Sequence, residues 1–195
     1  MKIGVDVDGV ILNFERDLKV HGELYNFLEL GKAGEKNKNG HYVAEIFGWN
    51  PEENVRFENK YFLSVSEKTP FMPGAVEVLK MLRADGHELI VISARGGSIP
   101  EMKDVALKRL SEVGLVFDKY YWAELDKEEV AKKEQLDLMI DDHPMHCEKL
   151  ANAGIKTLYF KDVNARDLEE SDYITEVTNW GEIYKIIKTK SDLKK

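Results

Sequence analysis

The sequence predicts an α/β fold, a parallel sheet flanked by helices with a small helical insertion after the first strand. Two observations support this prediction. From residue 70 onward, short apolar runs typical of strands alternate with helical segments, which implies a parallel sheet with right-handed crossovers. Before residue 70, only one strand-like run is found, and the rest has helical and loop patterns. A length of 195 residues suits one domain with an insertion rather than two full domains.

The opening run Lys2–Val5 is the first expected strand. A helix is expected over 11–30, where apolar residues recur at helical spacing. The polar, glycine-rich stretch 31–40 is expected to be a loop, and it lacks the spacing of a phosphate-binding P-loop. Asn50 followed by Pro51 begins a further helix, because Asn is favoured as an N-cap and Pro in the first turn.

No strand of the sheet is expected between residues 14 and 68. We therefore assign 14–68 to a helical insertion, and 1–13 together with 69–195 to the core domain. After the insertion, the elements expected in chain order are a helix over 73–84, a strand over 88–92, a helix over 100–113, a strand over 118–122, a helix over 127–134, a strand over 136–140, a helix over 144–152, a strand over 155–160 and a helix over 180–189.

Paired carboxylates directly follow two of the expected strands. Asp6 and Asp8 come after the first strand, and Asp141 and Asp142 come after strand 136–140. Residues just past the carboxyl ends of parallel strands lie where such sheets bind ligands. Two unit charges about 4 Å apart repel by roughly 4 kcal/mol at an effective dielectric of about 20, so crowded carboxylates need a cation or a raised pKa. Oxygen ligands without thiolates favour Mg²⁺ over Zn²⁺.

Each of these motifs also has a simpler interpretation. Asp8-Gly9 is a common turn dipeptide, and an Asp before Pro144 is a usual helix N-cap. One Asp could cap the helix while the other binds a metal. The neighbouring His143, His146 and Cys147 do not predict a transition-metal site, since no second pair of such ligands accompanies them.

Composition narrows the range of partners. Apolar residues make up 43% and charged residues 33% of the chain, as in globular proteins, and the net charge is −8. This charge argues against a nucleic-acid polymer or an anionic membrane as partner, but not against a small phosphate ester. A single Cys147 and the lack of a signal-peptide pattern predict a cytoplasmic protein. The oligomeric state is not predicted, and a homodimer stays open.

Four motifs in order resemble those of the haloacid dehalogenase (HAD) superfamily, metal-dependent phosphoryl-transfer enzymes with a Rossmann-like fold. The segment 5–10, DVDGV with its preceding valine, matches the first motif, and Ser93, after a hydrophobic strand, matches the second. Lys127 matches the third motif, and 140–144, IDDHP, matches the fourth. The insertion between the first two motifs stands where this superfamily carries a helical cap.

The resemblance implies a role for each matched residue. Asp6 would be the nucleophile that forms an aspartyl-phosphate, and Asp8 the general acid and base. Mg²⁺ would be held by Asp6, the backbone carbonyl of Asp8 and Asp141. Asp142 would orient the metal ligands or Lys127. The phosphoryl oxygens would be bound by residues of the second and third motifs: Ser93, Ala94 and Lys127.

Within the superfamily, DVDGV followed by a phenylalanine, here Phe14, is similar to the 5'(3')-deoxyribonucleotidases. The resemblance implies that a nucleobase stacks on Phe14, although a core position in the cap explains the residue equally well. The second motif departs from that family, because Ser93-Ala94-Arg95 replaces a Thr-Ser-Pro-like run. The sequence thus predicts an Mg²⁺-dependent phosphomonoesterase acting on nucleoside monophosphates. The alternatives are a sugar- or polyol-phosphate phosphatase and an inactive phosphate-binding regulatory module.

Overall fold

The computed structural model describes residues 1–161 and 166–192. Within them, six strands form one parallel sheet in the spatial order β3-β2-β1-β4-β5-β6. The strands are β1 (Lys2–Val5), β2 (Glu88–Ile92), β3 (Lys119–Tyr121), β4 (Leu138–Asp141), β5 (Thr157–Phe160) and β6 (Ile174–Val177). The chain progresses outward in opposite directions from β1 and β4, and ligands of open α/β sheets bind at such a reversal. The predicted α/β fold is confirmed.

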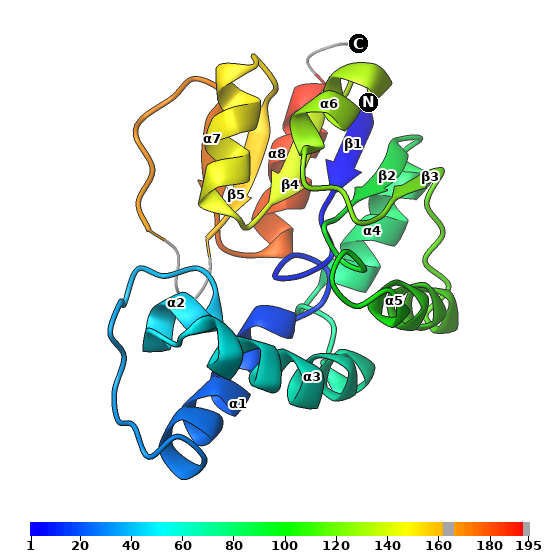
Figure 1. Ribbon diagram of the computed structural model, residues 1–195. Helices are drawn as coiled ribbons and strands as arrows, with labels where there is room; N and C mark the ends of the chain where they lie inside the picture. Colours follow the sequence, from blue (N-terminus) through cyan, green and yellow to red (C-terminus); the bar gives the residue numbers. More distant parts are fainter. Residues whose placement is uncertain (162–165, 193–195) are drawn as a thin grey trace.

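Helices cover both faces of this sheet (Figure 1). They are α4 (Ala75–Ala84), α5 (Glu101–Glu112), α6 (Lys127–Glu134), α7 (Pro144–Asn152) and α8 (Trp180–Asp192). Helices α4 and α8 pack together on one face, and α6 and α7 pack together on the other. Over the described residues, none of the helices combines the length and the apolar character needed to cross a membrane.

Alternating side chains along the strands account for the two helical layers. Ile90, Ile92 and Met139 belong to the apolar cluster shared with α6 and α7. Leu89 and Val91 belong to the larger cluster shared with α4 and α8. Both sets are buried, so the strands are apolar on both faces, as expected for a parallel sheet between two layers of helices.

Residues 14–68 contribute three helices: α1 (Phe14–Leu28), α2 (Val43–Phe47) and α3 (Pro51–Lys68). These helices lie beyond the carboxyl ends of the strands (Figure 1). Helix α3 begins where the sequence predicts, because Asn50 and Glu53 form a capping box with reciprocal hydrogen bonds of 2.9 and 3.0 Å. Aromatic side chains fill the space between the three helices, chiefly Tyr25, Trp49 and Phe57. We call residues 14–68 the helical segment.

The two chain passages between the sheet and the helical segment lie side by side. The Asn13 N–H donates to the carbonyl of Pro70 at 2.9 Å, and the Met72 N–H donates to the carbonyl of Ile11 at 2.8 Å. These backbone bonds fix the point at which the helical segment leaves the sheet. The segment is therefore anchored close to the carboxyl end of β1.

The structure differs from the sequence interpretation at three points. Helix α1 begins at Phe14 rather than residue 11, because the N–H groups of Ile11 and Leu12 turn back to the carbonyl of Val7. The cap of α7 is His143, whose Nδ1 accepts from the Met145 N–H at 3.2 Å, so an aspartate cap is wrong there. Strand β6 was not predicted, since half of its four residues are exposed and no apolar run marks it.

Candidate active site

Asp6 and Asp141 stand side by side because their strands are neighbours in register. Val5 pairs with Ile140, and the Asp6 N–H donates to the Ile140 carbonyl at 3.0 Å. Lys127, the first residue of α6, reaches both carboxylates. Its Nζ lies 2.6 Å from Asp141 Oδ2 and 3.1 Å from Asp6 Oδ1, and all three side chains are buried.

Asp142 completes a cluster of buried carboxylates with Asp6 and Asp141. One oxygen of each lies within 4.8 Å of the others. Gly9 allows this approach, because a Cβ there would come 1.9 Å from Asp142 Oδ2 and its φ of +71° favours glycine. Any larger residue at position 9 would force Asp142 or the loop after β1 to move.

Burial and neighbouring charges shift the pKa values of the three clustered carboxylates. Burial raises the pKa of Asp6 to about 6 against the attraction of Lys127, and the charges of Asp141 and Asp8 add to the rise. Burial and the charges of Asp6 and Asp141 raise the pKa of Asp142 well above its usual range. Burial alone would raise the pKa of Asp141, but Lys127 and His146 hold it below its ordinary value. The cluster thus holds more negative charge than Lys127 balances.

The loop after β2 brings a hydroxyl and a guanidinium to the same place. Ser93 is buried, and its Oγ accepts from the Arg95 N–H at 3.3 Å. The Arg95 side chain binds the carboxylate of Asp8, with Nε 3.1 and 3.0 Å from its two oxygens. Sequence reasoning noticed Arg95 only as a departure from a motif. No local signal could assign its partner, which lies 87 positions earlier in the chain.

A cavity of about 600 Å³ opens over the cluster, between the carboxyl ends of the strands and the helical segment. Every site residue expected from the sequence except Asp141 lines it: Asp6, Asp8, Phe14, Ser93, Ala94, Lys127 and Asp142. Asp141 lies beneath them, fully buried against Lys127. The structure therefore brings all the expected site residues together around one space.

The aromatic residues around the cavity differ in what they offer to a ligand. Phe14 is only 3% exposed, with the Arg95 guanidinium 4.7 Å from its ring centre and the Phe62 ring packed edge-on at 5.7 Å. Tyr42, from the loop before α2, lines the same cavity and is 52% exposed. Tyr42 therefore presents an open ring, whereas Phe14 is part of the packed wall.

Three histidines form one side of the cavity, which sequence reasoning did not foresee. His41, from the helical segment, lies with its ring centre 4.0 Å from that of His143, and His143 stacks on His146 at 4.5 Å. Burial lowers the pKa of His41 to about 4 and that of His143 to about 3, so both are neutral at pH 7. His41 is 102 positions from His143, so no sequence motif could pair them.

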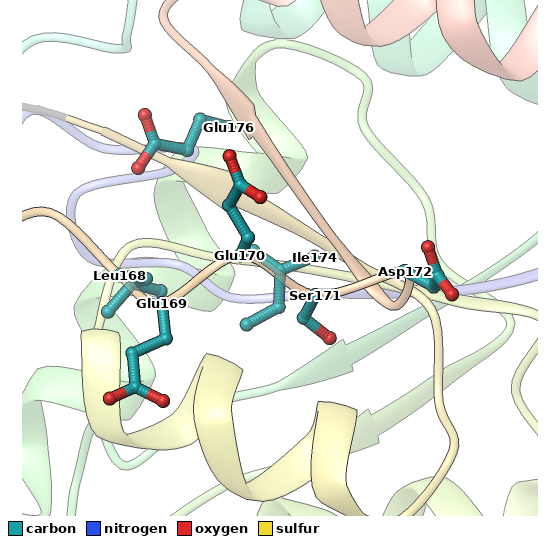
Figure 2. Close-up of a pocket in the computed structure, with 7 residues that line it drawn as sticks. All are labelled: Leu168, Glu169, Glu170, Ser171, Asp172, Ile174 and Glu176. Carbon is teal, nitrogen blue, oxygen red and sulfur yellow. The ribbon is translucent and has the colours of Figure 1, made fainter.

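A second hollow, of about 550 Å³, lies beside β6 and is lined mainly by acidic residues. Figure 2 shows their carboxylates spread around the loop rather than directed at one point. Glu169, Glu170 and Asp172 are all exposed. The hollow lacks the buried, converging groups that characterise the cavity above β1 and β4.

Two known proteins resemble most or nearly all of the chain. A "Putative nucleotidase" of Bacillus cereus is 30% identical over 201 residues, which cover 96% of this chain and 98% of that protein. A second protein so named, from Oceanobacillus iheyensis, is 24% identical over 81% of this chain and 85% of its own length. No family model matches the sequence.

Solved structures share the fold. A hydrolase of the haloacid dehalogenase-like family from Streptococcus pneumoniae superposes with a TM-score of 0.68 at 16% identity, covering 95% of this chain and 97% of that one. A predicted phosphatase from Clostridium acetobutylicum superposes with a TM-score of 0.66 at 14% identity, covering 96% and 98%. At these identities the likeness concerns the fold.

Proposed function

The chain belongs to the haloacid dehalogenase superfamily, and from this premise we propose that it hydrolyses phosphate monoesters, with nucleoside monophosphates as substrates. The observation that carries the proposal is the buried cluster of Asp6, Lys127, Asp141 and Asp142 at the bottom of a cavity. An anionic phosphoryl group needs a cation, fixed donors and an aligned nucleophile. The cluster has the groups for all three.

The carboxylate of Asp6 is the proposed nucleophile. One of its oxygens attacks phosphorus, the bond from phosphorus to the ester oxygen breaks, and Asp6 becomes an aspartyl-phosphate. With a pKa of about 6, Asp6 is mostly charged at neutral pH and ready to attack. Lys127 holds the Asp6 oxygen at 3.1 Å and adds positive charge where the phosphoryl oxygens would lie.

Asp8 is proposed to move the protons. It protonates the departing ester oxygen in the first step, and in the second it takes a proton from the water that attacks the aspartyl-phosphate. Inorganic phosphate then leaves and Asp6 is regenerated. Ser93 and the neighbouring Ala94 line the cavity beside Asp6, where they could donate to the phosphoryl oxygens.

The residues also fit a divalent cation. Three buried carboxylates with oxygens within 4.8 Å, two of them with raised pKa values, form a site with excess negative charge. The hard oxygen donors suit Mg²⁺, held by Asp6, Asp141 and the backbone carbonyl of Asp8, with Asp142 close enough to ligate or to orient the others. Such an ion would neutralise the phosphoryl charge and align the ester.

The cavity supports the choice of substrate. Aromatic and aliphatic side chains from the helical segment form much of its wall, as a planar base would require: Phe14, Leu18, Tyr42, Phe57 and Phe62. We therefore propose that the helical segment acts as a cap that binds the nucleoside, with Tyr42 as its exposed ring. The "nucleotidase" in the names of two relatives agrees with this choice.

A panel of phosphate esters tests the proposal. With Mg²⁺ present, we expect release of phosphate from nucleoside monophosphates with a higher kcat/KM than from ribose 5-phosphate and other sugar phosphates. Beryllium fluoride should inhibit by occupying the phosphoryl position on Asp6. Faster turnover of sugar phosphates would overturn the assignment of nucleotides as substrates, but phosphomonoester hydrolysis would still be supported. No turnover of any ester, with phosphate still bound, would indicate a regulatory module.

A further inference from the structure

The guanidinium of Arg95 is buried and fully engaged. Its side chain is 0% exposed, and it grips the Asp8 carboxylate through two nitrogens, Nε at 3.0–3.1 Å and Nη2 in a closer contact. Two parallel bonds between a planar guanidinium and a carboxylate fix the orientation of both groups. Asp8 is therefore held as well as charge-balanced.

The remaining nitrogen, Nη1, ties Arg95 to two helices. It contacts the Ser66 hydroxyl on α3 and donates to the Met102 carbonyl on α5 at 3.3 Å. The guanidinium also lies over the Phe14 ring, at 4.7 Å from its centre. Contacts with helices α1, α3 and α5 therefore fix the position of the Arg95 guanidinium.

The ion pair with Arg95 leaves Asp8 accessible from the cavity. The Asp8 side chain is 19% exposed and lines the cavity, so it can be reached from the place proposed for the substrate. A buried ion pair that only stabilised the fold would not need this access. The arrangement is instead that of an acid, Asp8, whose orientation is fixed by the buried guanidinium of Arg95.

We infer that Arg95 is a positioning residue for proton transfer. It orients the Asp8 carboxyl group toward the ester oxygen, and its own position depends on its contact with Ser66 of helix α3. The inference rests on the proposed function, because it takes Asp8 as the general acid. A misplacement of about 1 Å can cost about 10²-fold in rate, and a general acid contributes about 10²- to 10⁴-fold. Loss of Arg95 should then reduce kcat by about 10²-fold with little change in KM.

Leaving groups of different quality separate this role from a structural one. Phenyl phosphate needs a proton on its leaving oxygen more than p-nitrophenyl phosphate does, and the two esters are nearly the same size. We expect Arg95→Gln to reduce kcat/KM, which reports the first step and not the hydrolysis of the aspartyl-phosphate, about 10²-fold for phenyl phosphate and less than 10-fold for p-nitrophenyl phosphate. Arg95→Lys, which keeps the charge but cannot make two parallel bonds, should show the same selectivity.

Arg109 provides the matched control. It also contacts Ser66, through the backbone carbonyl at 3.2 Å, and lies over a phenylalanine ring, that of Phe71 at 5.2 Å, but it does not line the cavity. Arg109→Gln should leave the ratio of the two kcat/KM values unchanged. Melting temperatures of all variants identify any that fail to fold, and Arg95→Lys replaces Arg95→Gln in that case.

A double variant tests whether Arg95 acts through Asp8. Adding Arg95→Gln to Asp8→Asn should change kcat less than threefold, because the oriented acid is already gone. Equal losses of kcat/KM on both esters, or losses that multiply in the double variant, would overturn the inference. An inactive wild-type protein, or an Asp6→Asn variant as active as wild type, would instead overturn the proposed function.

Discussion

The carboxyl edge of the sheet and the helical segment meet at one cavity, but they place their side chains by different means. At the sheet edge, strand register sets the positions: Val5 pairs with Ile140, so Asp6 and Asp141 must be neighbours. In the helical segment, packing between three helices decides which rings are buried. Phe14 is 3% exposed and Tyr42 is 52% exposed, although both are aromatic residues beside the same cavity.

The difference indicates how each region can change. A carboxylate fixed by backbone register keeps its place as long as the sheet persists. A ring fixed by packing depends on the volumes of its neighbours, so the wall of the cavity can be altered without changing the charged cluster. We therefore expect the chemistry to depend on the sheet edge and the choice of substrate to depend on the helical segment.

The largest expected effect is at the sheet edge. Asp6→Asn keeps the size of the side chain but removes the proposed nucleophile, so turnover should fall by at least about 10³-fold with the fold intact. Initial rates on a nucleoside monophosphate, with circular dichroism as the folding check, measure this. Asp172→Asn, an exposed carboxylate beside β6, is the control and should keep wild-type activity. A tenth of wild-type activity in Asp6→Asn would contradict covalent catalysis.

The next effect concerns the cation. A chelator should abolish activity, and added Mg²⁺ should restore it, because three buried carboxylates repel both one another and the phosphoryl group. Ca²⁺ should restore less than about a tenth, since its longer bonds and higher coordination number would displace the Asp6 oxygen from phosphorus. Titration of the chelated protein with each ion measures this. Full activity in chelator at neutral pH would exclude the metal assignment.

The difference between the sheet edge and the helical segment also explains which features could be predicted from the sequence. Strands β1 to β5 and the carboxylates at the ends of β1 and β4 were predicted, because short apolar runs and the residues after them are local features. Lys127 was placed at the start of its helix for the same reason. The contact of Arg95 with Asp8 and the ring contact of His41 with His143 join distant parts of the chain, and only the folded structure brings them together.

The burial of individual side chains in the helical segment likewise could not be predicted from the sequence. Helical spacing placed Phe14 on an apolar face but could not show that Arg95 would cover its ring. Strand β6 was missed because Thr175 and Glu176 are exposed and interrupt its pattern. Edge strands with few apolar residues depend on their neighbour for definition, and here the neighbour is β5.

An intermediate effect is expected at the wall of the cavity. Stacking of a base on an aromatic ring contributes about 1–3 kcal/mol, so Tyr42→Ala should reduce kcat/KM for a nucleoside monophosphate by about 5- to 150-fold. Ribose 5-phosphate, which has no base, should be affected much less. Phe14→Ala should instead lower the melting temperature and impair both esters alike, because its ring is packed rather than open.

Tyr173→Ala serves as the control for that comparison, since Tyr173 is an exposed tyrosine far along the chain that does not line the cavity. A base-selective loss in Phe14→Ala with none in Tyr42→Ala would reverse the assignment. The base would then rest on Phe14, as the resemblance to the deoxyribonucleotidases implies, and Arg95 would have to move away from its ring.

The smallest expected effect is on stability without metal. The pKa of Asp6 is raised to about 6, so between about pH 4 and 6 the folded protein binds more protons than the unfolded chain. The free energy of unfolding attributable to Asp6 therefore falls as the pH rises through this window. The raised pKa of Asp142 adds a contribution of the same sign, because burial and its neighbours disfavour its charge. At neutral pH the buried carboxylates should thus lower the free energy of unfolding of the metal-free protein.

Asp142→Asn should remove part of this destabilisation, since the amide keeps the shape and carries no charge at any pH. In chelator at pH 7 we expect a gain of about 1 kcal/mol, which for a chain of this size is a rise of about 2–4 °C in melting temperature. The two proteins should converge toward pH 4, where Asp142 is protonated, and Mg²⁺ should narrow the difference at pH 7 by stabilising the wild type. Thermal melts across this pH range, with and without Mg²⁺, measure both trends. A lower melting temperature for Asp142→Asn in chelator at pH 7 would mean that the Asp142 charge is balanced by the protein itself, and the sheet edge would then need no cation to be stable.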